Sequence, residues 1–196
     1  MRESGEAEHV AGGGELRFRV AGSSDAPAVA QLHATSWRRH YRGAYADAFL
    51  DGDVLADRIA TWSERLARED DRRFTILAEA GELVGFANTH FDHAAHWGAL
   101  LDNLHVADGH QRGGVGSRLM ALTAAELLSR PRQTGLYLWV LEQNLAAQAF
   151  YRARGGECVG REPVKPPGGV EGRLVGSPAR LRFAWHDAAA LLDSPA

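Results

Sequence analysis

A glycine-rich turn is the part of the sequence best suited to holding a ligand. The segment LHVADGHQRGGVGSRLM (104–120) has Gly113, Gly114 and Gly116 between an expected strand and an expected helix. Glycines let a backbone approach a ligand closely, and the first N–H groups of a helix lack an acceptor within it. These groups and the positive end of the helix dipole attract anions. The turn therefore predicts a pyrophosphate-type site, although the same glycines also suit a plain tight connection.

Two motifs in this order resemble those of the GNAT superfamily of acetyl-coenzyme-A-dependent N-acetyltransferases. The family's pyrophosphate signature, [QR]-x-x-G-x-[GA] after a strand ending in Val, is matched by Gln111, Gly114 and Gly116 after Val106. Its later pattern, N-x-x-A-x-x-[FL]-Y-x-x-x-G, is matched by Asn144, Ala147, Phe150, Tyr151 and Gly155. The order of elements matches over about residues 15–186, and the segment 36–50 resembles the first-helix region of many bacterial members.

Two positions depart from the family pattern. Asp108 stands where a proline is common, and we expect this change to be harmless in a loop. Gly156 replaces the usual aromatic residue, and we expect this change to loosen the packing behind the second motif's helix.

The resemblance implies acetyl transfer from acetyl-CoA to a primary amine, by direct attack in a complex of both substrates. The amine would belong to a small molecule, a peptide or a protein. Backbone groups at the strand end 104–106 would pair with the pantetheine arm, and the amides of the turn would hold the pyrophosphate. The expected cofactor-binding residues are Leu104, His105, Val106, Gln111, Arg112, Gly113, Gly114, Val115, Gly116, Ser117, Asn144, Ala147 and Phe150.

Proton transfer requires an acid and a base. Tyr151 is our candidate acid for the departing thiolate, because a phenol pKa near ~10 lies above a thiol pKa near ~8.5; the alternative is a core tyrosine. Asp102 is our candidate base, and strand alternation predicts that it shares a face with Leu104 and Val106, opposite His105. Asp102 could equally be solvated or bind substrate, and Glu142 competes for the role of base.

The acceptor site is less clear in the sequence. Trp37 and Tyr41 are weak candidates, because the first helix flanks the acceptor cleft in the family; core packing is the favoured alternative. His90, His93 and His96 are spaced by three, which invites a metal interpretation. They lie in a strand-to-loop segment without a metal-binding frame, so we expect no metal and interpret them as loop histidines or acceptor contacts.

Hydrophobic periodicity predicts the elements that position these residues. Expected strands are 16–20, 74–80, 83–90, 99–106, 135–141, 158–160 and 180–185, and expected helices are 25–43, 55–66, 114–129 and 144–154. This order predicts an α/β sandwich with one mixed, mostly antiparallel sheet of six to seven strands and helices on both faces. We expect one domain at 14–186, flanked by tails at 1–13 and 187–196.

Composition excludes several other functions. Across the 196 residues, 22 basic and 25 acidic side chains give a net charge of −3, so a polycationic nucleic-acid binder is not expected. Lys165 is the only lysine and follows no phosphate-binding loop, which argues against a nucleotide enzyme of that type. A single cysteine and the lack of a long apolar run favour a cytoplasmic protein without a membrane span. A homodimer is possible, and a non-catalytic acyl-CoA-binding regulatory module is the alternative to an enzyme.

Overall fold

One mixed sheet organises the molecule. The computed structural model describes residues 14–68, 70–131 and 134–192. Its seven-stranded sheet has the order β1-β2-β3-β4-β5-β7-β6, and only β4 and β5 pair in parallel. The strands are β1 (Arg17–Val20), β2 (Arg73–Glu79), β3 (Leu83–Ala94), β4 (Gly98–Val106), β5 (Leu136–Leu141), β6 (Glu157–Pro163) and β7 (Ala179–Trp185). This sheet confirms the predicted fold class.

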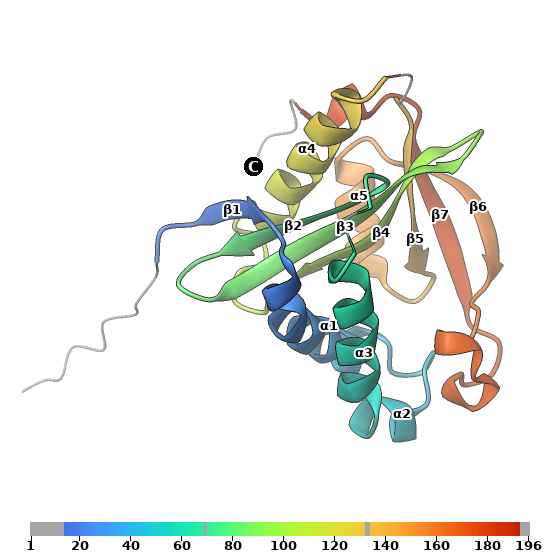
Figure 1. Cartoon of the computed structure of the whole chain (residues 1–196). Helices are drawn as coiled ribbons and strands as arrows, with labels where there is room; N and C mark the ends of the chain where they lie inside the picture. Colours follow the sequence, from blue (N-terminus) through green and yellow to red (C-terminus); the bar gives the residue numbers. More distant parts are fainter. Residues whose placement is uncertain (1–13, 69, 132–133, 193–196) are drawn as a thin grey trace, which may run out of the picture.

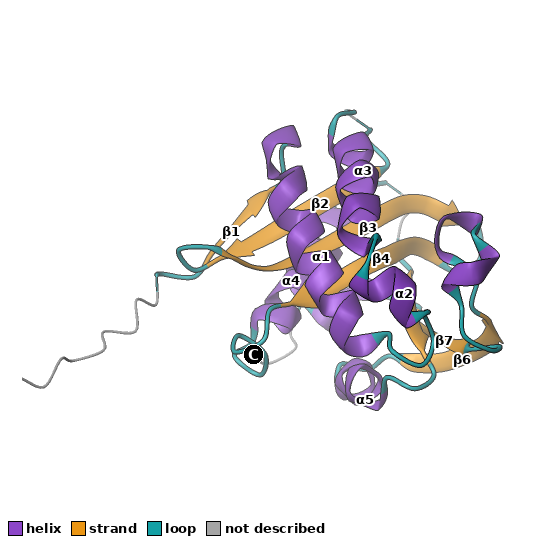
Figure 2. Cartoon of the chain, turned by 90° about the horizontal axis from the view of Figure 1, so that it is seen from below, coloured by secondary structure: helices purple, strands orange, loops and turns teal. Residues whose placement is uncertain are grey.

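Helices cover both faces of the sheet (Figures 1 and 2). The helices are α1 (Ala26–His40), α2 (Asp47–Asp51), α3 (Val54–Leu66), α4 (Val115–Leu128) and α5 (Leu145–Ala153). On one face, α1 and α3 pack on Leu77 and Phe86. On the other face, α4 buries its apolar side with Tyr151 of α5 in the largest core cluster. The prediction missed α2 and extended the first helix beyond its end at His40.

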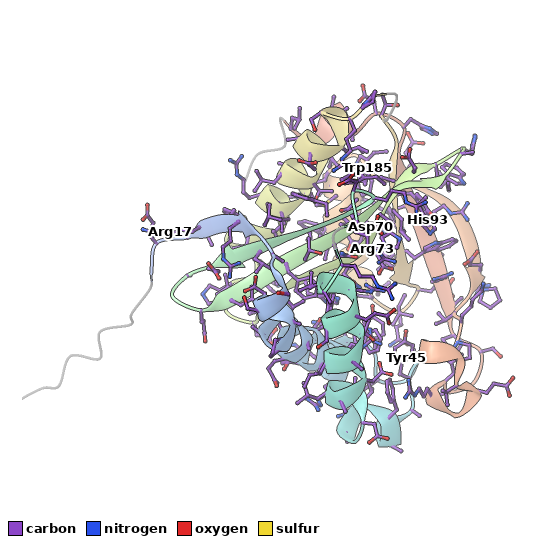
Figure 3. All side chains as sticks on the ribbon, in the orientation of Figure 1. Arg17, Tyr45, Asp70, Arg73, His93 and Trp185 are labelled. Atoms are coloured by element: carbon purple, nitrogen blue, oxygen red, sulfur yellow. The ribbon has the colours of Figure 1, made fainter. Side chains whose placement is uncertain are left out.

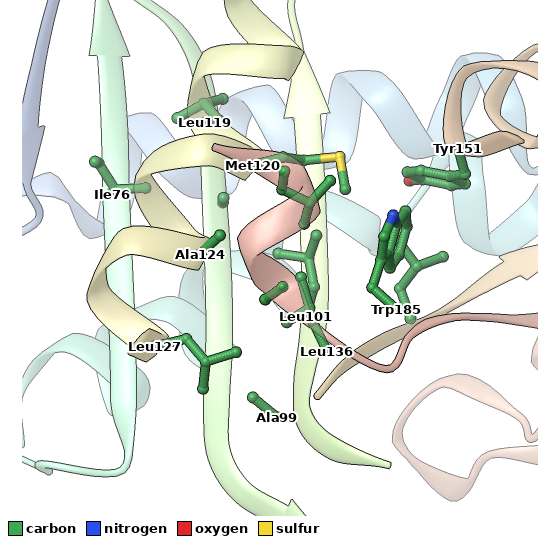
Figure 4. Packing of buried hydrophobic residues seen from close by; sticks show 14 of the residues in the cluster. Ile76, Ala99, Leu101, Leu119, Met120, Ala124, Leu127, Leu136, Tyr151 and Trp185 are labelled. Carbon is green, nitrogen blue, oxygen red and sulfur yellow. The ribbon is translucent and has the colours of Figure 1, made fainter. Parts of the chain in front are cut away.

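The core under α4 holds the glycine-rich turn against the sheet. Leu119, Met120 and Leu127 of this helix are fully buried and face the strands (Figure 4). Burial of such side chains contributes about 1.5–3 kcal/mol each, so the position of the helix is firmly fixed. The start of α4 is therefore held at the end of β4.

Two residues near the end of the described chain belong to the core. Ala188 and Leu191 lie in a short 3-10 turn, Ala188–Leu191, and are almost completely buried in the same cluster as α4. Two residues of the segment expected to be a C-terminal tail therefore pack beside α4. The remainder of that tail, 193–196, and the predicted N-terminal tail, 1–13, lie outside the described residues.

Strands β4 and β5 diverge soon after they pair. Their register contains only Ala99 with Leu136 and Leu100 with Tyr137, whereas β4 continues to pair with β3 up to Val106. Figure 1 shows β5 and β7 turning away from β4. The divergence leaves the β5-facing backbone edge of β4 open from Leu101 onward.

A β-bulge in β4 changes the predicted faces of this strand. Leu101 pairs with Thr89 and Asn103 pairs with Asn88, so Asp102 is the extra residue between the two pairs. Asp102 and Asn103 consequently both reach Arg65 of α3. The prediction that Asp102 shares a face with Leu104 and Val106 is therefore wrong, because a bulge resets the alternation of side chains.

Candidate functional site

A cleft of about 300 Å³ lies where β4 and β5 separate. Its walls are the two diverging strands, the glycine-rich turn, α5 and the end of α1. The lining residues are Ser36, His40, Tyr41, Leu101, Asp102, Asn103, Leu104, His105, Val106, Gln111, Arg112, Gly116, Leu138, Trp139, Val140, Leu141, Asn144, Ala146, Ala147, Phe150 and Tyr151. We call this space the β4–β5 cleft. It brings together predicted residues from both sequence motifs.

The glycine-rich turn presents helix amides at one end of this cleft. Gly114 is the N-cap of α4 with φ = 79°, and Arg112 has φ = 63°, so both adopt the left-handed conformation. The first backbone bond of the helix runs from the Arg118 N–H to the Gly114 carbonyl. The amides of residues 115–117 precede this bond and have no acceptor at i−4 within the helix. Three successive donors therefore point along the axis of α4 toward a prospective anion.

Close packing joins the two motifs. A Cβ on Gly116 would lie 3.3 Å from Phe150 Cζ, so a side chain here would push against α5. Ser117 Oγ accepts a hydrogen bond of 2.9 Å from Arg154 Nε, and the Arg154 guanidinium stacks on the Phe150 ring at 4.4 Å. The hydroxyl of Ser117 is thus already bound within the protein, while its backbone amide belongs to the turn.

The loop before the turn is tied to its surroundings by polar side chains. Gln111 Nε2 donates to the Val106 carbonyl and to Asp108 Oδ1, both at 3.3 Å. Asp108 also forms an ion pair with Arg39 of α1. The unusual residue at position 108 therefore connects the loop to α1.

Tyr151 is buried at the cleft. Only 8% of its surface is exposed, and its ring packs edge-on against Trp185 at 6.2 Å (Figure 4). Burial raises the pKa of its phenol above the ordinary value, and the neighbouring Tyr41 adds to that shift. The phenol consequently keeps its proton at neutral pH. Asn144 is the N-cap of α5, since the Ala147 N–H donates to Asn144 Oδ1 at 3.1 Å.

Gly156 does not loosen the packing behind α5. A Cβ at this position would lie 2.6 Å from Cζ2 of Trp185, so the absence of a side chain makes room for that indole. The Trp185 Nε1–H also donates to the Arg154 carbonyl at 2.7 Å. The expected loss of packing is wrong, because β7 supplies an aromatic ring at this place.

Asp102 and Glu142 have different surroundings. Asp102 lines the cleft, and its Oδ2 accepts a 2.8 Å hydrogen bond from Arg65 Nη1. Glu142 instead makes two 2.8 Å bonds to Arg161 outside the residues that line the cleft. The Arg161 guanidinium lowers the pKa of Glu142, which makes Glu142 a poorer base. The geometry favours Asp102 between the two.

The side chain of His105 takes part in a buried network that the sequence did not indicate. Its Nδ1 lies 2.7 Å from Ser36 Oγ, and its ring lies 4.6 Å from the ring of His33. His33 in turn accepts a 3.0 Å bond from Trp62 Nε1. Burial lowers the pKa of His105 to about 3 and that of His33 well below its ordinary value, so both rings are neutral at pH 7. Only the tertiary fold brings these residues together.

The two acceptor candidates on α1 separate in the structure. Trp37 is buried among Tyr41, Tyr45 and Phe49, with the Arg58 guanidinium 4.2 Å from its ring centroid. It is absent from the cleft wall, so core packing accounts for it. Tyr41 does line the cleft, and burial raises its pKa to about 12.

The three spaced histidines have separate partners. His93 is labelled in Figure 3, and its Nδ1 lies 2.6 Å from the Tyr137 hydroxyl, whereas His96 contacts the ring of Trp97. Among residues 14–68, 70–131 and 134–192, no group of three or more His, Cys, Asp or Glu side chains is placed to hold a metal ion. In the same ranges, no helix is long and apolar enough to cross a membrane.

A mixed sheet that opens between two parallel strands, over helix amides and a buried tyrosine, defines an α/β protein of the acyltransferase class. Comparison with known proteins agrees. Residues 26–155 match the model of the acetyltransferase (GNAT) family. The chain belongs to this family.

Two curated relatives that match along most of their length are also described as N-acetyltransferases. The chain is 30% identical over 166 residues to a probable N-acetyltransferase of Mycobacterium tuberculosis, Rv2775, covering 82% of this chain and 91% of the relative. It is 27% identical over 179 residues to YuaI of Bacillus subtilis, an uncharacterized N-acetyltransferase, covering 90% and 96%. These relatives favour an enzyme over the alternative of a non-catalytic module.

Solved structures share the fold at low identity. The PaiA N-acetyltransferase of Thermoplasma acidophilum, in complex with coenzyme A, has a TM-score of 0.65 at 18% identity, covering 87% of this chain and 99% of the other. NAA60 of Arabidopsis thaliana, in complex with acetyl-CoA, has a TM-score of 0.62 at 17% identity, covering 87% and 98%.

Proposed function

We propose that this protein transfers the acetyl group of acetyl-CoA to a primary amine by direct attack within the β4–β5 cleft. The observation that carries the proposal is the open edge of β4, which ends at the amides of α4 and faces Tyr151 across the cleft. The residues 104–106 pair with the pantetheine arm as an added strand would, and the amides of 112–117 hold the pyrophosphate. Arg112 and Arg118 add positive charge beside this turn.

Within this proposal, the candidate residues of the cleft have distinct roles. Tyr151 donates a proton to the departing thiolate, since its phenol is protonated and the thiolate is a base. Asp102 accepts a proton from the amine, directly or through water, while Arg65 holds its carboxylate in place. Asn144, Ala147 and Phe150 form the wall beside the thioester, and Tyr41 forms part of the acceptor wall.

Acetyl-CoA binding tests the cofactor half of the proposal. We expect the melting temperature to rise with acetyl-CoA concentration, because a ligand that binds only the folded state stabilises it by RT ln(1 + [L]/Kd). Release of free thiol with a panel of amines tests the transfer half. A melting temperature that rises with ATP but does not change with acetyl-CoA would contradict the proposal and would indicate a nucleotide site at the turn.

A further inference from the structure

A cationic aromatic cluster borders the β4–β5 cleft on the face that carries Asp102. Within it, the Arg182 guanidinium of β7 lies 4.4 Å from the ring centroid of Trp139, 5.1 Å from that of Trp97 and 5.8 Å from that of Tyr137. Trp139 itself lines the cleft. We call these four residues the Arg182 shelf.

Arg182 forms no ion pair with any carboxylate among the described residues. Across residues 14–68, 70–131 and 134–192, none of the ion pairs involves Arg182, and its Nε is buried without a hydrogen-bond partner. A guanidinium carries five N–H donors, and aromatic faces stabilise its charge but accept none of them as a carboxylate would. The Arg182 guanidinium therefore has N–H donors that an oxyanion can bind.

The neighbouring Arg180 stacks on the same indole and, unlike Arg182, is paired with a carboxylate. Arg180 also stands on β7 with its guanidinium over the ring of Trp139, at 4.5 Å. Its Nε donates to Glu162 Oε1 at 2.9 Å, so its charge is already paired. Two arginines thus flank the same indole, and only Arg182 lacks an anionic partner among the described side chains.

The shelf is open to a ligand and close to the site of transfer. Arg182, Trp97 and Trp139 are half-buried, and Tyr137 is held by its hydrogen bond to His93. Trp139 belongs both to the shelf, where Arg182 stacks on its ring, and to the cleft wall that Asp102 also lines. An acceptor that places its amine near Asp102 can therefore extend across Trp139 toward Arg182.

We propose that the Arg182 shelf binds a carboxylate or phosphate group of the acceptor, so that the preferred substrate is a small amine that also carries an oxyanion. This inference rests on the proposed acetyl transfer and specifies its substrate class. Arg182 supplies a planar, permanently charged fork that matches the two oxygens of such a group. The indoles restrict the guanidinium in advance, which lowers the entropic cost of binding.

Matched pairs of amines test the inference. γ-Aminobutyrate with its amide, and O-phosphoethanolamine with ethanolamine, differ mainly in the oxyanion, and the second pair tests phosphate in place of carboxylate. We expect the wild-type kcat/KM to favour the anionic member of at least one pair by about 10-fold or more. Arg182→Gln should reduce that preference to within about 3-fold, through KM, without changing the acetyl-CoA thermal shift.

Arg180→Gln is the matched control and should keep the preference, because Glu162 already pairs with Arg180. The inference is overturned if the wild type prefers the neutral or cationic member throughout, or if Arg182→Gln leaves the preference intact. Acetylation of the neutral or cationic amines alone would support the proposed function and contradict the inference. A protein that is stabilised by acetyl-CoA but acetylates no member of any pair also overturns it, whereas a protein without acetyl-CoA stabilisation contradicts the proposed function itself.

Discussion

Tyr151 and Asp102 are our candidates for the two proton transfers that the reaction requires. Attack by a neutral amine releases one proton to a base, and departure of the thiolate consumes one from an acid. Burial keeps the Tyr151 phenol protonated, and Arg65 orients the Asp102 carboxylate at the cleft. The two residues therefore suit opposite roles without competing for one proton.

Replacing Tyr151 by Phe removes the proton donor and keeps the ring that packs against Trp185. We expect kcat to fall about 100-fold or more, the scale of a lost general acid, with the acetyl-CoA Kd changed less than about 2-fold. Steady-state kinetics and a thermal-shift titration measure the two quantities. Tyr45→Phe is the control, since Tyr45 is a buried tyrosine of the α1–α2 region outside the cleft wall.

An unchanged kcat in Tyr151→Phe would remove Tyr151 from the role of acid.

Asp102→Asn tests the role of base, because Asn keeps an oxygen for Arg65 and loses the basic carboxylate. Its loss of kcat should be larger at neutral pH than at high pH, where more of the amine is already neutral.

The two motifs predicted several of the side chains that line the cleft. The motif residues Gln111, Gly116, Asn144, Ala147, Phe150 and Tyr151 all line the cleft, because sequence spacing on one helix or turn sets their positions. Arg65, Ser36 and Arg182 were missed, since each comes from an element far away in the sequence. No local pattern reports that Arg65 contacts β4 or that Arg182 stacks on Trp97.

At the scale of the elements, the N-cap of α4 sets the direction of the backbone amides in the glycine-rich turn. Gly114 adopts φ = 79° at the N-cap of α4, a conformation that costs an L-residue about 1–2 kcal/mol. An alanine here relaxes toward negative φ and rotates the adjoining peptide units away from the cleft. The glycine therefore holds the anion-binding geometry as well as ending the loop.

Gly114→Ala should weaken coenzyme A binding by about 10-fold and lower the free energy of unfolding by about 1–2 kcal/mol. Gly109→Ala is the matched control, because Gly109 has φ = 85° in the same loop and open space around it. It should cost similar stability while leaving the coenzyme A Kd unchanged. Isothermal titration and urea denaturation separate the two effects; equal losses of affinity in both variants would contradict the role of the turn.

Periodicity predicted the elements well and their buried faces less well. In α3, the apolar residues Leu55, Ile59, Trp62 and Leu66 recur at helical spacing, yet Ile59 is 39% exposed while Val54 and Arg58 are buried. Arg58 is buried because its guanidinium stacks on Trp37 and bonds Asp57, a tertiary arrangement that a hydrophobicity pattern cannot register. The bulge at Asp102 is similar, since it depends on how β4 pairs with β3.

At the scale of the whole molecule, neutral histidines join the helical layer to the sheet. His33 of α1 lies against Phe86 of β3 and His105 of β4, with ring centroids 5.7 Å and 4.6 Å away. Protonating either ring would place a charge in the contact between α1 and the sheet. His33 and His105 thus form one titratable cluster between α1 and the sheet. The positive charges of Arg58 and Arg65 near His33, and of His40 and Arg58 near His105, oppose protonation of these rings, whereas the negative charge of Asp102 favours protonation of His105.

This cluster makes stability depend on pH with a definite sign. The unfolded histidines take up protons below about pH 6.5, whereas the folded ones remain neutral until far lower pH, about 3 for His105. Stability from this source is therefore fully present above pH 6.5 and is lost as the pH falls toward 3. Each histidine should contribute a slope that approaches about 1.4 kcal/mol per pH unit below pH 6.

Urea denaturation at several values between pH 7.5 and 5 measures this slope. His105→Asn should reduce it by one histidine's share, even if the variant is less stable at every pH, because the titrating group itself is gone. His96→Asn, which replaces an exposed histidine beside Trp97, is the control for the loss of a histidine outside the contact between α1 and the sheet. If the slopes of His105→Asn and the wild type coincide, His105 already carries its proton in the folded protein, and the contact between α1 and β4 tolerates a charge that its burial should exclude.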